Sequence, residues 1–459
     1  MKTPSTSELQ ERLDGWRERF SVAGCSVGWM LGDEHGEAAS GVTNVNTGVE
    51  VTPDTLFQIG SITKVYTTTL IMQLADEGRI ALDAPAVTYL PDLRFTDADA
   101  TARVTLRQLL SHTSGVDGDF FDEHGRNDDA VERYVAACSK LPFVFESGKM
   151  WSYCNAGFVV LGRIVEVMAG MPWHVALRER LLNPLGVTHT LTRPEDALLH
   201  RAAAGHMVGF DRTISLAPRW SIGWSSGPAG ATPNSTIADL LTFARMHLDG
   251  GVARDGTRLL SEASVRAMQE PQMTLPEHPG GTFADQWGLG WMLFDWGGRR
   301  VIGHDGGTLG QNSSLRILPE ERFAVSVLTN TTPSGGILCT RIMRWMFEEY
   351  AGIAMPPHPK PPEEAPDIDL SPYVGTYERN EQRIEISERD GQLVATTIMT
   401  GPLATADQQM PPAELYAVNE RVFLQRTPGT GVYTPLSFLE FENGRPKYVF
   451  WSRLARRTS

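Results

Sequence analysis

Long apolar runs are absent from this sequence, so no stretch approaches the length that a membrane span needs. The N-terminal segment 1–20 is polar and charged and lacks the apolar core of a signal peptide. Together these absences predict a protein that stays in the cytoplasm. A surplus of positive charge is also lacking, because the formal net charge is -14 at pH 7. This argues against nucleic acid or an anionic membrane as the main partner, although Arg453, Arg456 and Arg457 form a locally basic tail that we expect to be solvated.

Cysteine is scarce, and the four residues lie far apart, at Cys25, Cys138, Cys154 and Cys339. Their spacing fits no metal-ligand pattern, so we expect neither a metal nor another cofactor. In a reducing compartment these cysteines are expected to remain free thiols. Internal repeats are absent as well, which argues against a solenoid or a propeller.

At 459 residues the chain is longer than one hydrophobic core usually accommodates. Prolines crowd the segment between residues 356 and 366, which can hardly be helix or central strand and is expected to be a stiff linker. We therefore expect a large domain at 1–353, a Pro-rich linker at 354–371 and a small domain at 372–459.

Hydrophobic periodicity predicts strands at both ends of the large domain and helices between them. The predicted strands are 26–31, 38–43, 288–294, 300–303, 313–318 and 324–328. The predicted helices are an N-terminal one ending near Phe20, then 64–77, 106–110, 130–137, 158–168, 175–182, one capped by Ser235 or Thr236, and a closing helix at 338–350. This order predicts an α/β (α+β) fold in which one antiparallel sheet, assembled from both ends, carries an inserted helical region.

The small domain alternates apolar and polar residues in short runs separated by turn signals such as Asp390-Gly391 and Asn443-Gly444. The runs are 374–377, 383–386, 393–397, 422–425, 438–441 and 448–451. This pattern predicts a small antiparallel β-barrel, whose closure would leave no exposed edge strand.

Three short segments carry groups that can perform acyl-transfer chemistry. The first is Ser61 to Lys64, at the start of the helix predicted from Lys64 to Glu77. Residues three apart on a helix face the same way, so the Lys64 amine can take the proton of the Ser61 hydroxyl. The helix start also presents free N–H groups to a developing oxyanion. A helix cap at Ser61 and a solvated Lys64 are the alternative.

The second segment is Tyr153-Cys154-Asn155, directly before an apolar helix. A tyrosine hydroxyl can relay a proton, and an asparagine amide can hold both a lysine and a substrate carbonyl. The third is His304-Asp305-Gly306-Gly307, after an apolar strand. Its glycines would let a substrate backbone approach and leave N–H groups free. A capped helix start and a turn between strands are the alternatives for the two segments.

Taken in this order, the three segments resemble the motifs of serine β-lactamases, penicillin-binding proteins and related esterases and D-peptidases, in the class C-like branch. Segments 109–115, 183–186 and 235–240 are similar to the same branch, and the resemblance covers roughly residues 10 to 350. The resemblance implies that Ser61 is the acylated nucleophile and that Lys64 and Tyr153 form its proton network. Asn155 would orient Lys64 and the substrate amide, and His304 would take the place of the third-motif lysine. The backbone N–H groups of Ser61 and Gly307 would form the oxyanion hole.

Other residues are expected to shape the site or the fold. Cys154 replaces a Ser or Ala at a position that points away from substrate in the family, and His112 is expected to have a structural role. Gly306 is expected to contact substrate. Four tryptophans, of which Trp224 is the candidate for substrate binding, would line a cleft or pack in the core: Trp220, Trp224, Trp287 and Trp291. In the small domain, Arg445 is expected to touch substrate, with a solvated turn residue as the alternative.

The resemblance implies that an acyl donor acylates Ser61 and that a second nucleophile then takes the acyl group. With water the chain would be a carboxylesterase, a D-stereospecific peptidase or a weak β-lactamase, and with an amine a transpeptidase or cyclase. The small β-domain makes the chain most similar to penicillin-binding-protein-type thioesterases, which carry a lipocalin-like domain and cyclise peptidyl thioesters with a D-configured C-terminal residue. Such a substrate would be delivered by a peptidyl carrier protein. The non-enzyme alternative is an acyl-binding sensor, and the oligomeric state is left open.

Overall fold

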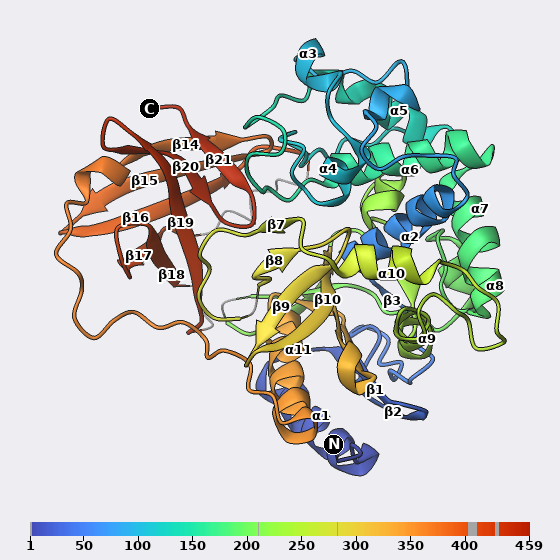
Figure 1. The fold of residues 1–459 in the computed structure, drawn as a ribbon. Coiled ribbons are helices and arrows are strands. Elements are labelled where there is room, and N and C mark those ends of the chain that lie inside the picture. The colour runs from blue at the N-terminus through green and yellow to red at the C-terminus, as the bar shows by residue number, and fades with distance from the viewer. Residues whose placement is uncertain (1, 210, 282, 403–410, 427–430) are drawn as a thin grey trace.

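The computed structural model describes residues 2–209, 211–281, 283–402, 411–426 and 431–459. Figure 1 shows a large part, in which helices pack against a sheet, and a β-barrel beside it that carries the C-terminus. The predicted fold class is confirmed: an antiparallel sheet with an inserted helical region, followed by a closed antiparallel barrel.

The large sheet has eight strands in the order β2-β1-β12-β11-β10-β9-β8-β7. The two ends of the large part therefore meet within this sheet, where Val27 of β1 faces Val327 of β12 in antiparallel register. The strands are β1 (Gly24–Leu31), β2 (Glu34–Gly41), β7 (Met273–Thr274), β8 (Gln286–Trp287), β9 (Met292–Trp296), β10 (Arg299–Thr308), β11 (Gln311–Leu318) and β12 (Phe323–Thr329).

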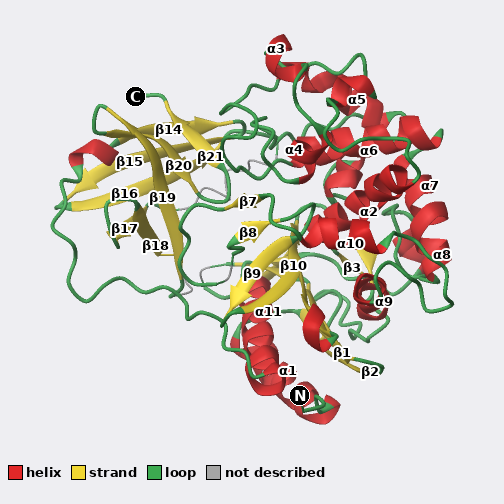
Figure 2. Ribbon diagram, in the orientation of Figure 1, coloured by secondary structure: helices red, strands yellow, loops and turns green. Residues whose placement is uncertain are grey.

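Alternating side chains give this sheet two buried faces. On β12, Val325 and Val327 belong to one apolar core, and Ala324 and Leu328 belong to another. The helices α1 (Thr6–Arg19) and α11 (Ser334–Met346) cover the first face, while α9 (Ile237–Leu248) covers the second together with the helical insertion (Figure 2). Because both faces of β1 and β12 are buried, these two strands are largely apolar runs in the sequence.

The helices lie close to their predicted positions, and two of them, α4 and α5, match their predicted ranges. The helices are α1 (Thr6–Arg19), α2 (Thr63–Asp76), α3 (Ala98–Thr101), α4 (Leu106–Leu110), α5 (Ala130–Ala137), α6 (Asn155–Ala169), α7 (Trp173–Leu177), α8 (Asn183–Leu185), α9 (Ile237–Leu248), α10 (Glu262–Gln269) and α11 (Ser334–Met346). Within the described residues, no single helix is long and apolar enough to cross a membrane, and one sharply bent pair, Asn155–Ala169 with Trp173–Leu185, meets the length and composition criteria only when taken together.

Very short strands escaped the sequence prediction because two or three residues carry no readable period. They are β3 (Phe57–Gln58), β4 (His206–Val208), β5 (Ile214–Leu216), β6 (Asn234–Ser235) and β13 (Thr331–Thr332). The strand predicted at 288–294 was wrong in its bounds, since a turn with Gly290 at φ +75° separates β8 from β9. Helix α10 was also missed.

The C-terminal barrel closes with β14 beside β21. Its strands are β14 (Gly375–Arg379), β15 (Gln382–Arg389), β16 (Gln392–Met399), β17 (Ala413–Ala417), β18 (Val422–Arg426), β19 (Tyr433–Glu442), β20 (Arg445–Phe450) and β21 (Leu454–Arg457). Segment 352–370 contains neither helix nor strand, in agreement with its prolines. It is not a free tether, because Arg344 of α11 donates hydrogen bonds to the carbonyl oxygens of Met355 and Pro356 at 2.7 and 2.8 Å.

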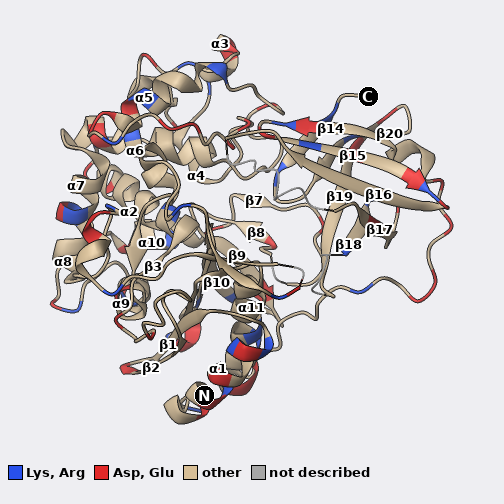
Figure 3. Cartoon of the chain, turned by 180° about the vertical axis from the view of Figure 1, so that it is seen from behind, with Lys and Arg blue, Asp and Glu red and all other residues tan. Residues whose placement is uncertain are grey.

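Of the three arginines predicted to form a solvated tail, Arg456 is exposed, whereas the prediction was wrong for Arg453 and Arg457. Leu454 and Ala455 are buried in β21, and Arg457 donates a hydrogen bond to the carbonyl oxygen of Pro372 at 2.7 Å. Arg453 forms an ion pair with Asp119 of the large part. In Figure 3 basic residues lie among acidic ones along the ribbon, and these C-terminal arginines are part of the barrel.

Candidate active site

Ser61 lies in the short 3-10 helix η1 (Gly60–Ile62), which runs directly into α2. The contact that its spacing from Lys64 predicts is present, with Lys64 Nζ 3.0 Å from Ser61 Oγ. Nζ also donates a hydrogen bond to the carbonyl oxygen of Ala229 at 2.5 Å. Lys64 is completely buried, and burial, followed by the charge of Arg453, holds its pKa well below the usual value. A neutral Lys64 amine can accept the Ser61 proton.

Tyr153 lies beside this pair. Lys64 Nζ is 4.8 Å from the centre of its ring, and the guanidinium carbon of Arg453 is at the same distance, 4.8 Å. The Tyr153 hydroxyl is buried and has no hydrogen-bond partner of good geometry among the residues that the structure describes. Burial raises its pKa, and the proximity of Ser61 lowers it to a smaller extent. Tyr153 is therefore protonated at neutral pH and can donate a proton to a leaving group.

His112 supports the Tyr153 segment from behind. It is fully buried at φ +57°, and its Nδ1 accepts a hydrogen bond from the backbone N–H of Cys154 at 3.0 Å. Its ring lies 4.2 Å from the Tyr153 ring. Cys154 caps α6, because its Sγ accepts a hydrogen bond from the N–H of Gly157 at 3.3 Å, and burial raises its thiol pKa to about 12. Both residues hold the backbone in place.

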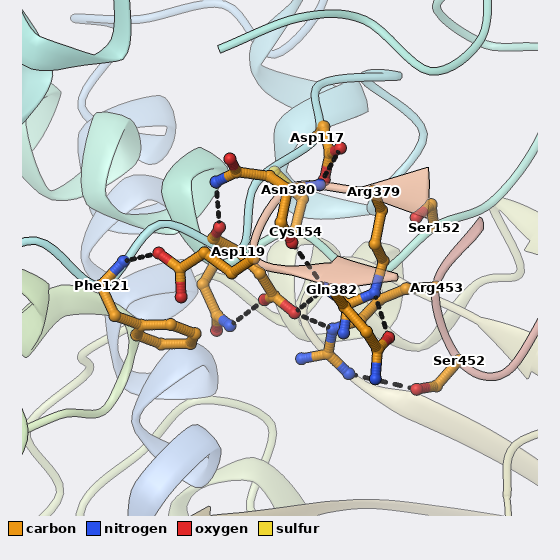
Figure 4. Close-up of polar contacts among 12 residues, drawn as sticks. Asp117, Asp119, Phe121, Ser152, Cys154, Arg379, Asn380, Gln382, Ser452 and Arg453 are labelled. Atoms are coloured by element: carbon orange, nitrogen blue, oxygen red, sulfur yellow. Dashed lines mark hydrogen bonds and ion pairs between the residues drawn. The ribbon is translucent and has the colours of Figure 1, made fainter. Parts of the chain in front are cut away.

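Asn155 does not hold Lys64 as expected. Among the described residues its side chain donates a hydrogen bond to Asp119, with Nδ2 2.8 Å from Oδ1. Asp119 is buried in the loop between α4 and α5, and the barrel residues Arg379 and Arg453 each approach its other oxygen to 2.6 Å (Figure 4). Burial would raise the Asp119 pKa, but Arg453 and Arg379 lower it to about 2. The carboxylate is therefore ionised.

The third segment, 304–307, lies inside strand β10. The sequence prediction had placed it after the end of a strand. It runs beside the turn that carries Ser61. A Cβ atom added to Gly60 would lie 2.6 Å from the Gly307 nitrogen, and one added to Gly306 would lie 2.0 Å from the carbonyl oxygen of Ile59. Glycine is thus required at 60 and 306 for this close approach. The approach places the N–H groups of Gly307 and Ser61 on neighbouring segments, as an oxyanion hole requires.

His304 cannot replace a cationic lysine at neutral pH. It is buried, and its Nδ1 lies 2.6 Å from the carbonyl oxygen of Asp305. Burial, followed by the charge of Lys64, lowers the pKa of His304 to about 3. The ring is 6.3 Å from that of Tyr153, and Nε2 has no partner among the described residues. A neutral imidazole at this place offers substrate a hydrogen bond, not a charge.

The four tryptophans divide between core and cavity. Trp287 and Trp291 are completely buried, whereas Trp220 and Trp224 line a cavity of about 300 Å³. Trp224 begins the 3-10 helix η6 (Trp224–Ala229), which ends at the carbonyl oxygen that accepts from Lys64. The cavity therefore lies one short helix from the nucleophile. Its lining combines the two tryptophans with Glu123, Arg126, Glu195 and Arg219, so it can accept a substrate side chain that has apolar and polar parts.

The barrel reaches the site through Arg453, not through Arg445. Arg445 begins β20 opposite Glu442, at the end of the strand remote from the turn that carries Arg453. Sequence reasoning grouped Arg453 with the basic tail. Its position between apolar pairs, Phe450-Trp451 and Leu454-Ala455, was the signal that it is not part of a solvated tail. Asp119 and Arg379 gave no local signal, because tertiary contacts bring them together. No cluster of potential metal ligands occurs within the described ranges.

The family model called Beta-lactamase matches residues 22–345. Penicillin-binding protein 4 of Amycolatopsis lactamdurans is 43% identical over 374 residues, which cover 81% of this chain and 97% of that protein. The crystal structure of SurE superposes with a TM-score of 0.77 at 28% identity and covers 98% of both chains, and that of SurE with D-Leu superposes with a TM-score of 0.73 at 27% identity over the same shares. A D-stereospecific amidohydrolase from Streptomyces gives a TM-score of 0.59 at 25% identity, over 76% of this chain and 100% of that one.

The family match covers most of the chain, and the relatives are serine enzymes that share its fold. The chain therefore belongs to the beta-lactamase family, which includes the penicillin-binding proteins, and is a serine hydrolase or acyltransferase of that type.

Proposed function

We propose that this protein transfers a peptidyl group from a thioester or ester with a D-configured C-terminal residue, through an acyl-enzyme on Ser61, to the peptide's own N-terminal amine. The observation that carries the proposal is the likeness to SurE over 98% of both chains, barrel included, together with the similarity to a SurE structure that contains D-Leu. The chain would then be a head-to-tail peptide cyclase.

In the acylation step Ser61 Oγ attacks the acyl carbon while Lys64 Nζ, 3.0 Å away, takes the hydroxyl proton. The bond from Ser61 Oγ to the acyl carbon forms, and the carbon–sulfur bond of the thioester breaks. The departing thiolate receives a proton through Tyr153, whose hydroxyl is protonated at neutral pH. The N–H groups of Ser61 and Gly307 stabilise the oxyanion.

In the second step the terminal amine attacks the acyl carbon. The amide bond forms, the bond to Ser61 Oγ breaks, and the proton lost by the amine returns to Ser61 through Lys64. Two features support an amine over water as acceptor. Lys64 and Tyr153 are buried, and the barrel covers the Tyr153 segment. The cavity beside Trp224 offers space for a peptide side chain. Delivery of the peptide by a carrier protein in the cytoplasm belongs to the same proposal.

A linear peptide with a D-residue C-terminal thioester mimic tests the proposal by mass spectrometry. The cyclase predicts a product lighter than the hydrolysed peptide by one water, formed by the wild type and not by Ser61→Ala. The same peptide with an L-residue at its C-terminus is the matched control and is expected to react more slowly. Hydrolysed peptide as the sole product would overturn cyclisation and leave the acyl-enzyme chemistry standing.

A second candidate is D-stereospecific hydrolysis, with water as the acceptor. The likeness to the Streptomyces D-stereospecific amidohydrolase favours it, and so does the neutral His304, which removes the third-motif cation. A chromogenic ester also separates both enzymes from an acyl-binding sensor. An enzyme turns over many equivalents, whereas a sensor releases one equivalent and stops.

A further inference from the structure

The buried carboxylate of Asp119 joins the second motif to the barrel. It accepts a hydrogen bond from Asn155 Nδ2 on one oxygen, at 2.8 Å. Arg379, the last residue of β14, and Arg453, in the turn before β21, approach the other oxygen to 2.6 Å each. Figure 4 shows both guanidinium groups converging on this carboxylate from the barrel side.

Such a carboxylate fixes the orientation of the Asn155 amide. An ionised carboxylate accepts hydrogen bonds and cannot donate them, so the NH₂ group of Asn155 has to face Asp119. The amide oxygen of Asn155 is then directed away from Asp119 and is free to accept a hydrogen bond. With a neutral partner at 119 either orientation of the amide would be compatible with a hydrogen bond.

The charge of Asp119 is tolerated in this place because the barrel neutralises it. A buried carboxylate is costly unless cations and hydrogen bonds compensate it. Both of the cations that pair with it belong to the barrel, and a backbone segment of the barrel is fixed to the same motif. The N–H of Tyr153 donates to the carbonyl oxygen of Ser452 at 3.1 Å, and the N–H of Leu454 donates to Ser152 Oγ at 3.1 Å.

The tip between β14 and β15 holds the loop of Asp119 from its other side. The N–H of Asn380 donates to Asp117 at 2.6 Å, and the N–H of Phe121 donates to Glu381 at 2.9 Å. The loop 117–121 is thus bound to the barrel on both sides of Asp119.

We propose that Asp119 is a positioning residue that orients Asn155 for acylation of Ser61, and that Arg379 acts on acylation through it. The docked barrel is then a component of the acylation site. This inference rests on the proposed function of Ser61 as the acylated nucleophile.

The test is a mutant cycle on the full chain with a chromogenic ester, whose burst reports acylation. Asp119→Asn keeps the side-chain volume and is expected to slow the burst at least about tenfold, with KM changed by less than about threefold, since small misplacements cost this much. Arg379→Gln, which removes a guanidinium paired with Asp119, is expected to slow it as well. The double variant is expected to be within about twofold of Asp119→Asn, because both changes break one connection. Independent losses that multiply in the double variant would overturn the inference.

Tyr448→Phe is the matched control. It removes another buried contact of the barrel, the hydrogen bond from Tyr448 Oη to the carbonyl oxygen of Val144 at 3.0 Å, and is expected to keep the burst within about twofold of the wild type. Equal slowing in Tyr448→Phe would contradict a specific role of Asp119.

If Asp119→Asn fails to fold, Arg379→Gln keeps Arg453 as counter-charge and is expected to slow the burst in the folded protein. An unchanged burst would then overturn the inference. A wild type that forms no acyl-enzyme contradicts the proposed function itself, whereas an acylating wild type with independent losses contradicts only the inference drawn from Asp119.

Discussion

At the scale of single residues, the buried Lys64 amine is the group on which the chemistry depends. Its surroundings include Arg453, which lowers its pKa, and Asp119 and Cys154, which raise it. His112 and His304 lie near it, and the pKa of each is itself lowered by Lys64. The ring of Tyr153, whose hydroxyl is protonated, lies against the Lys64 amine. The neutral form of Lys64, present above its pKa, is the form that accepts a proton, so the rate of acylation rises with pH through that pKa.

Arg453→Met tests this dependence. Removing the Arg453 charge raises the Lys64 pKa, so the acidic limb of the kcat/KM profile is expected to move to higher pH. Steady-state rates with an ester substrate across a pH series measure the shift. A limb that stays in place or moves to lower pH would show that Lys64 is not the titrating base.

Two adjacent glycines of β10 give a matched pair of variants. A Cβ at Gly306 would meet the carbonyl oxygen of Ile59 at 2.0 Å, whereas one at Gly307 would have Asn312 Nδ2 as its nearest neighbour at 3.8 Å. Gly306→Ala is therefore expected to push β10 away from the Ser61 turn and lower kcat at least about 100-fold. Gly307→Ala is expected to retain within about tenfold of wild-type kcat. The reverse order of the two rates would refute the close approach of β10 to Ser61.

The extent to which the sequence predicts the site depends on how local each contact is. The Ser61–Lys64 contact follows from helical spacing and is present. By contrast, the residues Asn155, Asp119, Arg379 and Arg453 are all far apart in the sequence. Hydrophobic periodicity gives no indication that they are in contact. Because such long-range contacts cannot be read from the sequence, Arg445, which follows an evident turn, was predicted to touch substrate and Arg453 was not.

At the scale of elements, long periodic segments were predicted and contacts between elements were not. Helix α4 matches its predicted range because a capping box of Thr105 and Gln108 defines its start, and α5 matches because its buried apolar residues recur at helical spacing. The strands β17 and β21 were missed, and β10 extends through the glycines for which a turn between strands was the alternative interpretation. Glycine in a strand interior marks close approach of another backbone, here that of η1.

The tip between β14 and β15 makes barrel docking sensitive to pH. Burial raises the pKa of Glu381 to about 7, with Asp119 and Asp122 acting in the same direction and the Phe121 N–H and Arg379 opposing it. Burial also raises the pKa of Asp117 to about 6. Because both folded-state pKa values are above the ordinary ones, the folded state favours the protonated forms. The corresponding stability is present below about pH 4 and is lost as pH rises through 6 to 7.

Glu381→Gln is expected to reduce this loss of stability. The decrease in Tm between pH 5.5 and pH 8 should be smaller in the variant than in the wild type by about 1–2 °C, the size expected for a partly exposed group in a chain of this length. Calorimetry at the two pH values measures it. An equal or larger decrease in the variant would show that Glu381 does not contribute to the pH dependence.

At the scale of the whole molecule, the barrel and the large part share one apolar core. Tyr448, Phe450 and Leu454 of the barrel belong to the same cluster as Trp151 and the sheet residues, while a separate cluster fills the barrel interior. We therefore expect the chain to unfold in one calorimetric transition, although the sequence had indicated two domains joined by a stiff linker.

Phe450→Ala tests this coupling, since Phe450 is fully buried with its ring 5.9 Å from that of Trp151. The variant is expected to lose about 3–5 kcal/mol of stability and to slow acylation together with it. Phe438→Ala, which empties a site in the barrel's own core, is the control for barrel folding. A Phe450→Ala protein with wild-type acylation and two separate transitions would show that the barrel is not part of the site.

The central claim is that a D-configured peptidyl group becomes attached to Ser61 with Lys64 as the base. Intact-protein mass spectrometry of the wild type, Ser61→Ala and Lys64→Ala, each mixed with the D-residue thioester and quenched within seconds, tests it most directly. The account predicts a mass increase of one acyl group in the wild type, mapped to Ser61 by digestion, and none in either variant. Acylation of another residue, or an undiminished adduct in Lys64→Ala, would contradict it.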